Sequence, residues 1–384
     1  MKPPAGASDR DAWLLLAAVT GVGPRTCGAL VRSFGTPARA VAAAAGPRGV
    51  DRLAAVPGVT RARAAAVVDA LARADPAAMD REARAAGLFL LTPVDADYPA
   101  ALAGSCDPPP AVWGRGTLPP ADRPAVAVVG TRGASPYGLR VAHALGKALA
   151  RAGLVVVSGL ARGIDGAAHA GALAGGGPTV GVLGCGVDVV YPPEHAALAG
   201  EIAACGALLS EHPPRTSPHP GHFPRRNRIV AALSRAVIVV EAPLDSGALV
   251  TARLAADLGR DVLAVPGPVD RGTHAGCHRL LRDGARLCEG IQDVLLLLRG
   301  EELPPLDGSG DGPSLFAALP TRTPPPDGPA LVLWNALDPD DARDFDDLAA
   351  RTGLSPDVVA IALTHLELEG YAHRVPGLGF RRVL

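Results

Sequence analysis

Six short, almost continuously apolar runs constrain the fold of this chain more than any other feature of its sequence. They lie between residues 125 and 300 and read AVAVVG, LVVVSGL, TVGVLG, ALLSE, AVIVVEA and DVLAVPG. Ala- and Leu-rich stretches of helical character separate most of them. Apolar, β-branched runs that alternate with helices are typical of a parallel sheet buried on both faces. The sequence therefore predicts an α/β fold with a Rossmann-like, doubly wound, mostly parallel sheet.

Different patterns flank this region and predict further modules. Residues 1–95 contain two similar stretches, VTGVGPRTCGALVRSFG and LAAVPGVTRARAAAVVDAL, each with a Gly turn and an Arg between helices. They indicate a helical domain of the helix-hairpin-helix, SAM-like type, whose Gly turns either approach phosphates or only connect helices tightly. Residues 96–300 form the Rossmann-like domain. Residues 301–328 are a Pro/Gly-rich linker, and residues 329–384 have the helix, turn, helix and hairpin order of a winged helix.

Charge and cysteine content limit the environment of the protein. The formal net charge is −1, but the first 74 residues carry ten Lys or Arg against four acids, and residues 329–384 carry five Arg against nine acids. Such asymmetry indicates modules with different partners. The six cysteines include no C-x-x-C pair, which is typical of reduced thiols. No apolar stretch is long enough to span a bilayer, so we expect a cytoplasmic protein without a membrane partner.

The turns that follow the predicted strands are rich in Gly, Arg and hydroxyl side chains. Ligands of open α/β sheets bind beyond the carboxyl ends of the strands, where Gly-rich turns at helix N-termini hold anions. The turns VGTRGASPYG, SGLARGIDGAAH and EAPLDSGALVTA supply such residues. The candidates are Gly130, Thr131, Arg132, Ser158, Gly159, Arg162, Gly163, Asp165, Ser246 and Gly247. We predict a row of anion sites along one edge of the sheet.

The segment FPRRNRIVAAL, residues 223–233, adds a cluster of cations directly before the AVIVVEA run. It predicts a helix that carries Arg225, Arg226, Asn227 and Arg228 near its start. Residues at these spacings share a helix face only in part, so one Arg is expected to pair locally, for example with Glu241 or Asp245. The other arginines are expected to contact phosphates. Asn227 is expected to bond a base edge or a backbone group.

Common ligand classes fit these motifs poorly. The first strand is not followed by G-x-G-x-x-G, the second ends in SGLARG in place of an acid, and no P-loop is present. The sequence therefore predicts no nucleotide cofactor. His212, His219 and His222 lie in a Pro-rich loop without a nearby Cys or a pair of carboxylates, which argues against a metal site.

These motifs, taken together and in order, resemble the DNA-processing protein A (DprA/Smf) family. The resemblance runs from YPAALAGSCDPPPAVWGRG through VAVVGTRGASPYG, VVVSGLARGIDGAAHAGAL and FPRRNRIVAALS to LLRDGA, and covers residues 98–290. It implies single-stranded DNA binding by the Rossmann-like domain, loading of RecA recombinase during natural transformation and recombination, and a homodimer. By motif, the DNA-facing positions would be Arg132, Ser158–Asp165 and Arg226–Arg228. In GCHRLLRDGA, His278 stands where the family usually has Asn.

Two other functions compete with that of a non-enzymatic single-strand binder. EAPLDSGALVTA also resembles the loop of Rossmann-like nucleoside-monophosphate glycohydrolases, but the first acid after it is Asp257, which leaves Asp165 or Glu241 as the alternative carboxylate. A groove-reading transcription factor needs a basic recognition helix, whereas SPDVVAIALTHLELEG contains three acids and no Arg. That module is better interpreted as a protein-interaction or regulatory unit. The candidate aromatic residues for base stacking are Phe223, Tyr137 and Tyr191.

Overall fold

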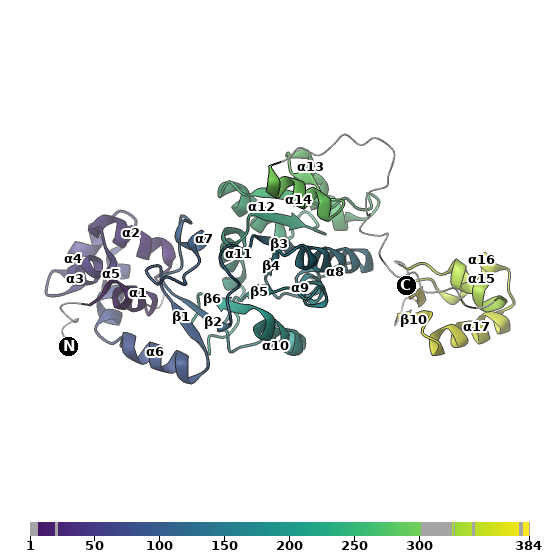
Figure 1. Cartoon of the computed structure of the whole chain (residues 1–384), viewed down its shortest axis with the longest axis horizontal. Coiled ribbons are helices and arrows are strands. Elements are labelled where there is room, and N and C mark those ends of the chain that lie inside the picture. The colour runs from purple at the N-terminus through teal and green to yellow at the C-terminus, as the bar shows by residue number, and fades with distance from the viewer. Residues whose placement is uncertain are drawn as a thin grey trace.

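The computed structural model describes residues 7–19, 22–300, 325, 327–339, 342–375 and 379–383. Figure 1 shows a helical N-terminal part, a central sheet covered by helices and a small C-terminal module. The predicted linker, residues 301–328, lies outside the described residues except at 325, 327 and 328.

The N-terminal part is helical, as the sequence predicted. Side chains that precede four of its helices accept hydrogen bonds from first-turn amides: Ser8 from Asp11, Thr36 from Arg39, Thr60 from Arg63, and Asp75 from Ala77 and Ala78. Buried leucines, valines and alanines form a core of their own within this part. The helices are α1 (Asp9–Ala17), α2 (Pro24–Phe34), α3 (Pro37–Ala44), α4 (Gly49–Ala54), α5 (Arg61–Leu71) and α6 (Pro76–Ala85).

The central sheet has nine strands in the order β1-β2-β6-β5-β4-β3-β7-β8-β9. The six predicted runs form its parallel centre: β3 (Ala125–Val129), β4 (Val155–Ser158), β5 (Thr179–Val182), β6 (Ala207–Ser210), β7 (Ala236–Val239) and β8 (Asp261–Ala264). The parallel α/β prediction is confirmed. Three short strands were not predicted: the antiparallel pair β1 (Phe89–Leu91) and β2 (Val112–Gly116), and β9 (Arg286–Leu287). The sheet thus begins at Phe89, before the predicted domain boundary at 95/96.

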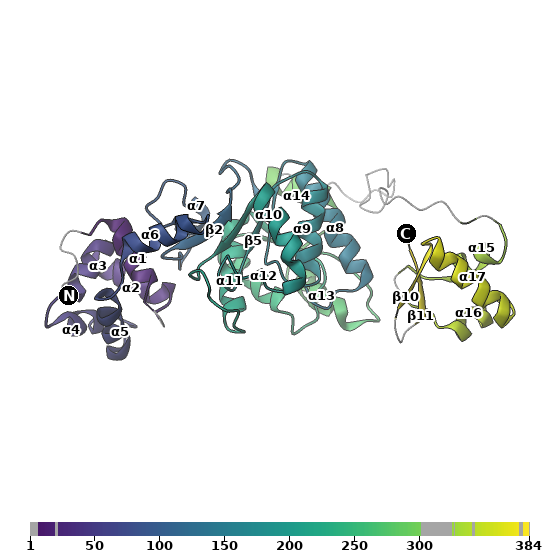
Figure 2. The ribbon, with the colours of Figure 1, turned by 90° about the horizontal axis from the view of Figure 1, so that it is seen from below.

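Helices cover both faces of the sheet (Figures 1 and 2). Along β3, Ala127 and Val129 pack in one core with residues of α11 (His222–Leu233), α12 (Gly247–Asp257) and α13 (Ala275–Arg282). Val126 and Val128 point to the other core, against α8 (Pro136–Arg151), α9 (Ile164–Ala174) and α14 (Ile291–Arg299). The remaining helices are the short α7 (Ala100–Ala103), α10 (Ala196–Cys205) and the 3-10 turns η1 (Pro193–His195) and η2 (Gly272–His274). The alternation along β3 explains why its run is apolar throughout.

Glycines let α8 and α9 pack backbone to backbone, which leads to a stability prediction. A Cβ added at Gly171 of α9 would overlap the carbonyl of His143 on α8. We expect Gly171→Ala to destabilise the domain by about 1–3 kcal/mol, because the helices must separate. Gly200 in α10 has no atom near the position of an added Cβ, so Gly200→Ala is the matched control and should be neutral or stabilising by up to about 1 kcal/mol. Urea unfolding of both variants measures the difference, and equal stabilities would contradict this account of the α8–α9 contact.

The C-terminal module has its own core and the predicted winged-helix order. Its elements are α15 (Pro329–Ala336), α16 (Phe345–Thr352), α17 (Pro356–Leu368) and the hairpin β10 (Ala372–Val375) and β11 (Gly379–Arg382). Leu333, Leu348, Leu363 and Leu366 are buried together between the helices. Among the described residues of the whole chain, no helix combines the length and apolar character needed to cross a membrane.

Candidate nucleic-acid interface

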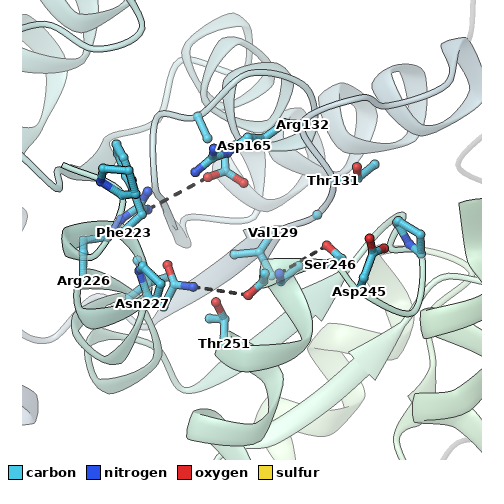
Figure 3. Close-up of a pocket in the computed structure, with 18 of the residues that line it drawn as sticks. Val129, Thr131, Arg132, Asp165, Phe223, Arg226, Asn227, Asp245, Ser246 and Thr251 are labelled. Atoms are coloured by element: carbon cyan, nitrogen blue, oxygen red, sulfur yellow. Dashed lines mark hydrogen bonds and ion pairs between the residues drawn. The ribbon is translucent and has the colours of Figure 1, made fainter. Parts of the chain in front are cut away.

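A cavity of about 550 Å³ opens at the carboxyl ends of β3 and β7, between α11 and α12 (Figure 3). It lies at the edge of the sheet where the sequence predicted anion sites. Eight of the predicted site residues line it: Gly130, Thr131, Arg132, Asp165, Arg226, Asn227, Ser246 and Gly247. The other predicted residues, Ser158, Gly159, Arg162, Gly163, Arg225 and Arg228, are not among its lining residues.

Arg226 forms part of the cavity wall from within the protein. The residue is 4% exposed, and its Nη1 lies 4.0 Å from Oδ2 of Asp165. Its Nε is buried and has no hydrogen-bond partner in the described part of the chain. Asp165 also accepts a hydrogen bond from the amide of Gly159 at 3.1 Å. Burial raises the pKa of Asp165, and the nearby Arg226 opposes that rise. The wall therefore holds a buried, positively charged donor whose bonding capacity is not fully used.

Arg132 forms the rim of the cavity together with two aromatic rings. It follows β3 in an exposed turn, and its guanidinium carbon lies 5.1 Å from the centre of the Phe223 ring. The Phe223 and Tyr191 rings are 5.5 Å apart, between centroids. A guanidinium held over an aromatic face keeps its charge and its outward donors available. The rim thus offers a cation and an apolar stacking surface side by side.

Two helices start beside the cavity, and a glycine lets the start of α9 approach the turn after β3 closely. Ser246 caps α12, accepting a hydrogen bond from the amide of Ala248 at 3.3 Å. Gly163 precedes α9 with a φ of 72°, and a Cβ there would overlap the carbonyl of Thr131. The amides of such helix starts attract anions. Asn227 links α11 to this region by donating from Nδ2 to the carbonyl of Gly247 at 3.3 Å.

Two expectations for the arginine cluster need correction. Arg226 pairs with Asp165, whereas the sequence analysis named Glu241 or Asp245 as the local partner. Glu241 is fully buried and accepts hydrogen bonds from the amide and hydroxyl of Ser135, at 3.1 and 2.8 Å, so it stabilises the start of α8. Arg228, expected at a phosphate, is 17% exposed and pairs with Glu211. It also donates to the carbonyl of Asp107 at 2.7 Å, which fixes α11 to the loop after α7.

Other predicted positions lie away from the cavity. Ser158 was expected to face DNA, but it is fully buried and donates to the carbonyl of Val128 at 2.6 Å, which gives it a role within the sheet. Arg162 is exposed near the start of α9 and pairs with Glu194. Arg225 is exposed, and its guanidinium lies close to Gly23 of the helical domain. Tyr137 donates to the carbonyl of Pro266 at 3.0 Å, so of the three aromatic candidates only Phe223 and Tyr191 line the cavity.

The remaining polar candidates have structural partners. His278 lies with Nε2 3.1 Å from the carbonyl of Gly267, so it makes a contact to a neighbouring loop at the position where the family usually has Asn. The rings of His212 and His222 stack with centroids 4.0 Å apart, and burial lowers the pKa of His212 to about 4. Among the described residues, no cluster of three His, Cys, Asp or Glu has an arrangement suited to a metal ion.

Several residues of the cavity were not predicted from the sequence. Val230 and Thr251 line it from the interiors of α11 and α12, and Ala161 and Pro243 lie in the turns after β4 and β7. For Val230 and Thr251 the available signal was their position one helical turn after the predicted residues Arg226 and Gly247. The hydrolase alternative gains no support from the geometry. Of its two candidate carboxylates, Glu241 accepts a hydrogen bond from Ser135, and Asp165 faces the buried Arg226.

Comparison with known proteins identifies similar chains and domains. The family model for DNA recombination-mediator protein A matches residues 89–299, a SAM-like helix-hairpin-helix tandem model matches 14–73, and a DprA winged helix domain model matches 317–378. The chain is 35% identical over 316 residues to protein Smf of Synechocystis, covering 76% of this chain and 79% of that protein. It is 39% identical over 298 residues to a putative DNA processing protein DprA of Mycobacterium tuberculosis, covering 74% of each.

Two solved structures are also similar. The X-ray structure of DNA processing protein A from Streptococcus pneumoniae has a TM-score of 0.63 and 32% identity, covering 79% of this chain and all of that one. A structure of DNA processing protein A from Helicobacter pylori, described for its single-stranded DNA binding mode, has a TM-score of 0.51 and 33% identity. That comparison covers 56% of this chain and 97% of the other.

Proposed function

This chain belongs to the DNA recombination-mediator protein A family, and we propose that it binds single-stranded DNA in the cavity between α11 and α12. The observation that carries the proposal is the pairing of two different cations in one cavity. Arg226 is buried with an unpartnered Nε, and Arg132 is exposed above an aromatic ring. A site for a neutral ligand would need neither cation.

The cavity offers more contacts to the phosphate backbone of a nucleotide strand than to the edges of its bases. Arg132 and the N-terminus of α12 face the space in which a phosphate would lie, and Arg226 supports it from the wall. Phe223 and Tyr191 offer ring faces on which any base can stack. Asn227 already donates to Gly247, and within the described part of the chain its amide oxygen has no hydrogen-bond donor. We therefore expect binding with little sequence preference. The similarity to the Helicobacter pylori protein supports a single-stranded ligand.

Fluorescence anisotropy with a labelled oligo-dT across a salt series tests this function. Arg132→Ala is expected to weaken binding about tenfold and to reduce the salt slope by about 0.7, the value for one phosphate contact on a single strand. Arg151→Ala is the matched control, because this exposed arginine lies at the end of α8, on the opposite edge of the sheet. Duplex of the same length should compete poorly. Unchanged affinity and slope in Arg132→Ala would exclude this cavity as the phosphate site.

We further propose that the protein acts as a cytoplasmic homodimer, without enzymatic activity, that loads RecA onto the bound strand. Family membership supports this proposal, since the family is that of recombination mediators. The assay follows RecA assembly on a long single strand, with and without this protein. Substitutions that abolish a dimer in light scattering should impair assembly more than they impair binding of a short oligonucleotide. Equal losses in the two assays would argue against a separate role for the dimer.

A further inference from the structure

Arg225 is the one arginine of the α11 cluster that forms no ion pair within the described residues. It is exposed and directly follows Pro224, which lines the cavity between α11 and α12, but it is not itself among the lining residues. Its Nη2 lies 2.8 Å from the position that a Cβ on Gly23 of the helical domain would occupy. Figure 1 shows α11 on the side of the sheet domain that faces the helical domain. Arg225 thus brings an unpaired cation to the boundary between the two domains.

Gly23 belongs to the first of the two Gly turns of the helical domain and directly precedes α2. Its amide has no acceptor in the described part of the chain. Arg25, in the first turn of α2, adds a second cation, whose side chain is 89% exposed. Its Nε donates to Asp107 at 2.9 Å, and its two terminal nitrogens have no partner among the residues that the structure describes. Donors from both domains therefore meet at this boundary.

The neighbouring groups do not neutralise Arg225. Arg228, one turn further along α11, already pairs with Glu211. His212 stays uncharged at neutral pH, because burial, the adjacent His222 and the charges of Arg225 and Arg228 lower its pKa to about 4. A phosphate group can neutralise an unpaired arginine and accept hydrogen bonds from more than one guanidinium at once. The boundary is therefore suited to a phosphate.

The second Gly turn of the helical domain is arranged differently. Thr60 caps α5 by accepting a hydrogen bond from the amide of Arg63. Arg61 pairs with Asp51 of the same domain at 2.6 Å. In the described part of the chain, no atom lies within 4 Å of the position that a Cβ on Gly58 would occupy. Of the two turns, only the first is thus in contact with an arginine of the sheet domain.

We propose that a strand bound in the cavity continues over the exposed start of α11 to the helical domain, where Arg225 and Arg25 contact its next phosphates beside Gly23. This path rests on the proposed single-strand binding and extends it to a second domain. Arg25 can exchange Asp107 for a phosphate, because an ion pair of so exposed an arginine contributes little to stability. The first Gly turn thus approaches phosphates, whereas the second only connects helices.

Fluorescence anisotropy of the full chain with oligo-dT of two lengths tests this path. A strand of about 4 nucleotides occupies the cavity alone, whereas one of about 16 extends beyond it. Arg225→Ala is expected to weaken binding of the longer strand about tenfold and to reduce its salt slope by about 0.7, with the shorter strand unaffected. Arg63→Ala is the matched control, because Arg63 is also exposed and without an ion pair in the described residues, but lies beside the second Gly turn.

Gly23→Asp tests the helical domain's side of the path without loosening the fold. The backbone at Gly23 has a φ of −90° and a ψ of 174°, which suits Asp as the cap of α2, so urea unfolding should show no loss of stability. The new carboxylate would meet Arg225 and repel a phosphate, so we expect about a tenfold loss of affinity for the longer strand only. Thr60→Asp adds the same charge at the cap of α5 and should bind both strands as the parent protein does.

The two strand lengths separate failure of this path from failure of the proposed function. Losses confined to the longer strand in Arg225→Ala and Gly23→Asp support the path. If Arg132→Ala lost affinity at both lengths while these two variants bound as the parent protein does, the path would be overturned and the cavity site would stand. Equal losses at both lengths in Arg225→Ala would also overturn the path, because this arginine would then act within the cavity. If the parent protein bound neither strand at low salt, the proposed function would fail and the path with it.

Discussion

Arg226→Ala is expected to destabilise the sheet domain by about 3–5 kcal/mol at neutral pH, because it leaves Asp165 buried without its counter-charge. Arg151→Ala, a substitution of the same type at an exposed site, should cost less than about 0.5 kcal/mol. Hydrogen exchange of peptides from β3, β4 and β7, measured across a urea series, reports the stability of this domain separately from the other modules. Equal stabilities of the two variants would mean that Asp165 does not depend on Arg226.

The loss of stability caused by Arg226→Ala should depend on pH. Burial already raises the pKa of Asp165, and removing Arg226 removes an influence that lowers it, so the pKa rises further. A carboxyl whose pKa is higher in the folded state stabilises that state at low pH and loses the contribution as the pH rises through the folded pKa. The variant should therefore approach the parent protein as the pH falls through the raised pKa of Asp165 in the folded variant. If the difference in stability between the variant and the parent protein did not change with pH, its cause would be lost packing and not an unpaired charge.

A charge-neutral replacement separates these two causes further. Asp165→Asn combined with Arg226→Met removes both charges and keeps similar volumes. Replacing a buried ion pair by neutral groups is often close to neutral in stability. We expect the double variant to recover most of the loss seen in Arg226→Ala, yet to bind oligo-dT more weakly than the parent protein. Full recovery of both stability and binding would show that the charge of Arg226 serves only the fold.

The sequence predicted the parallel strands because each is a run of apolar residues that only a sheet buried on both faces can accommodate. It did not predict β1 or β9, which have three and two residues, because so short a segment carries no periodicity. The position of the candidate site was predictable for the same reason as the sheet. The carboxyl ends of parallel strands meet at one edge, so the turns after β3, β4 and β7 had to converge.

The roles within the arginine cluster were not predictable in the same way. Arg225, Arg226 and Arg228 look alike in sequence, and their surroundings depend on which helix face meets the sheet. In the structure Arg226 turns inward to Asp165, Arg228 meets Glu211 on β6's carboxyl side, and Arg225 stays at the surface. Both acidic partners come from other turns of the sheet edge. Only the tertiary arrangement determines which arginine forms an ion pair with an acidic residue.

Gly159→Ala is expected to displace Arg226 without removing a charge, and so to destabilise the sheet domain and weaken oligo-dT binding. The guanidinium of Arg226 lies across Gly159, and an added Cβ would overlap its terminal nitrogens. The side chain of Arg226 must then leave its position beside Asp165 at a cost of several kcal/mol, on the order of that for breaking the pair. Gly200→Ala, in α10 and not among the residues that line the cavity, has open space around the added Cβ, so it is the matched control and should bind oligo-dT normally.

Combining the two substitutions shows whether Gly159 acts through Arg226. If the glycine matters only because Arg226 crosses it, the double variant Gly159→Ala and Arg226→Ala should be no less stable than Arg226→Ala alone. The coupling energy in this cycle would then be about as large as the effect of Gly159→Ala itself. Additive losses would show that the glycine serves the turn after β4 independently of Arg226. The same cycle measured with oligo-dT binding applies the test to the cavity, since Gly159 is not itself one of its lining residues.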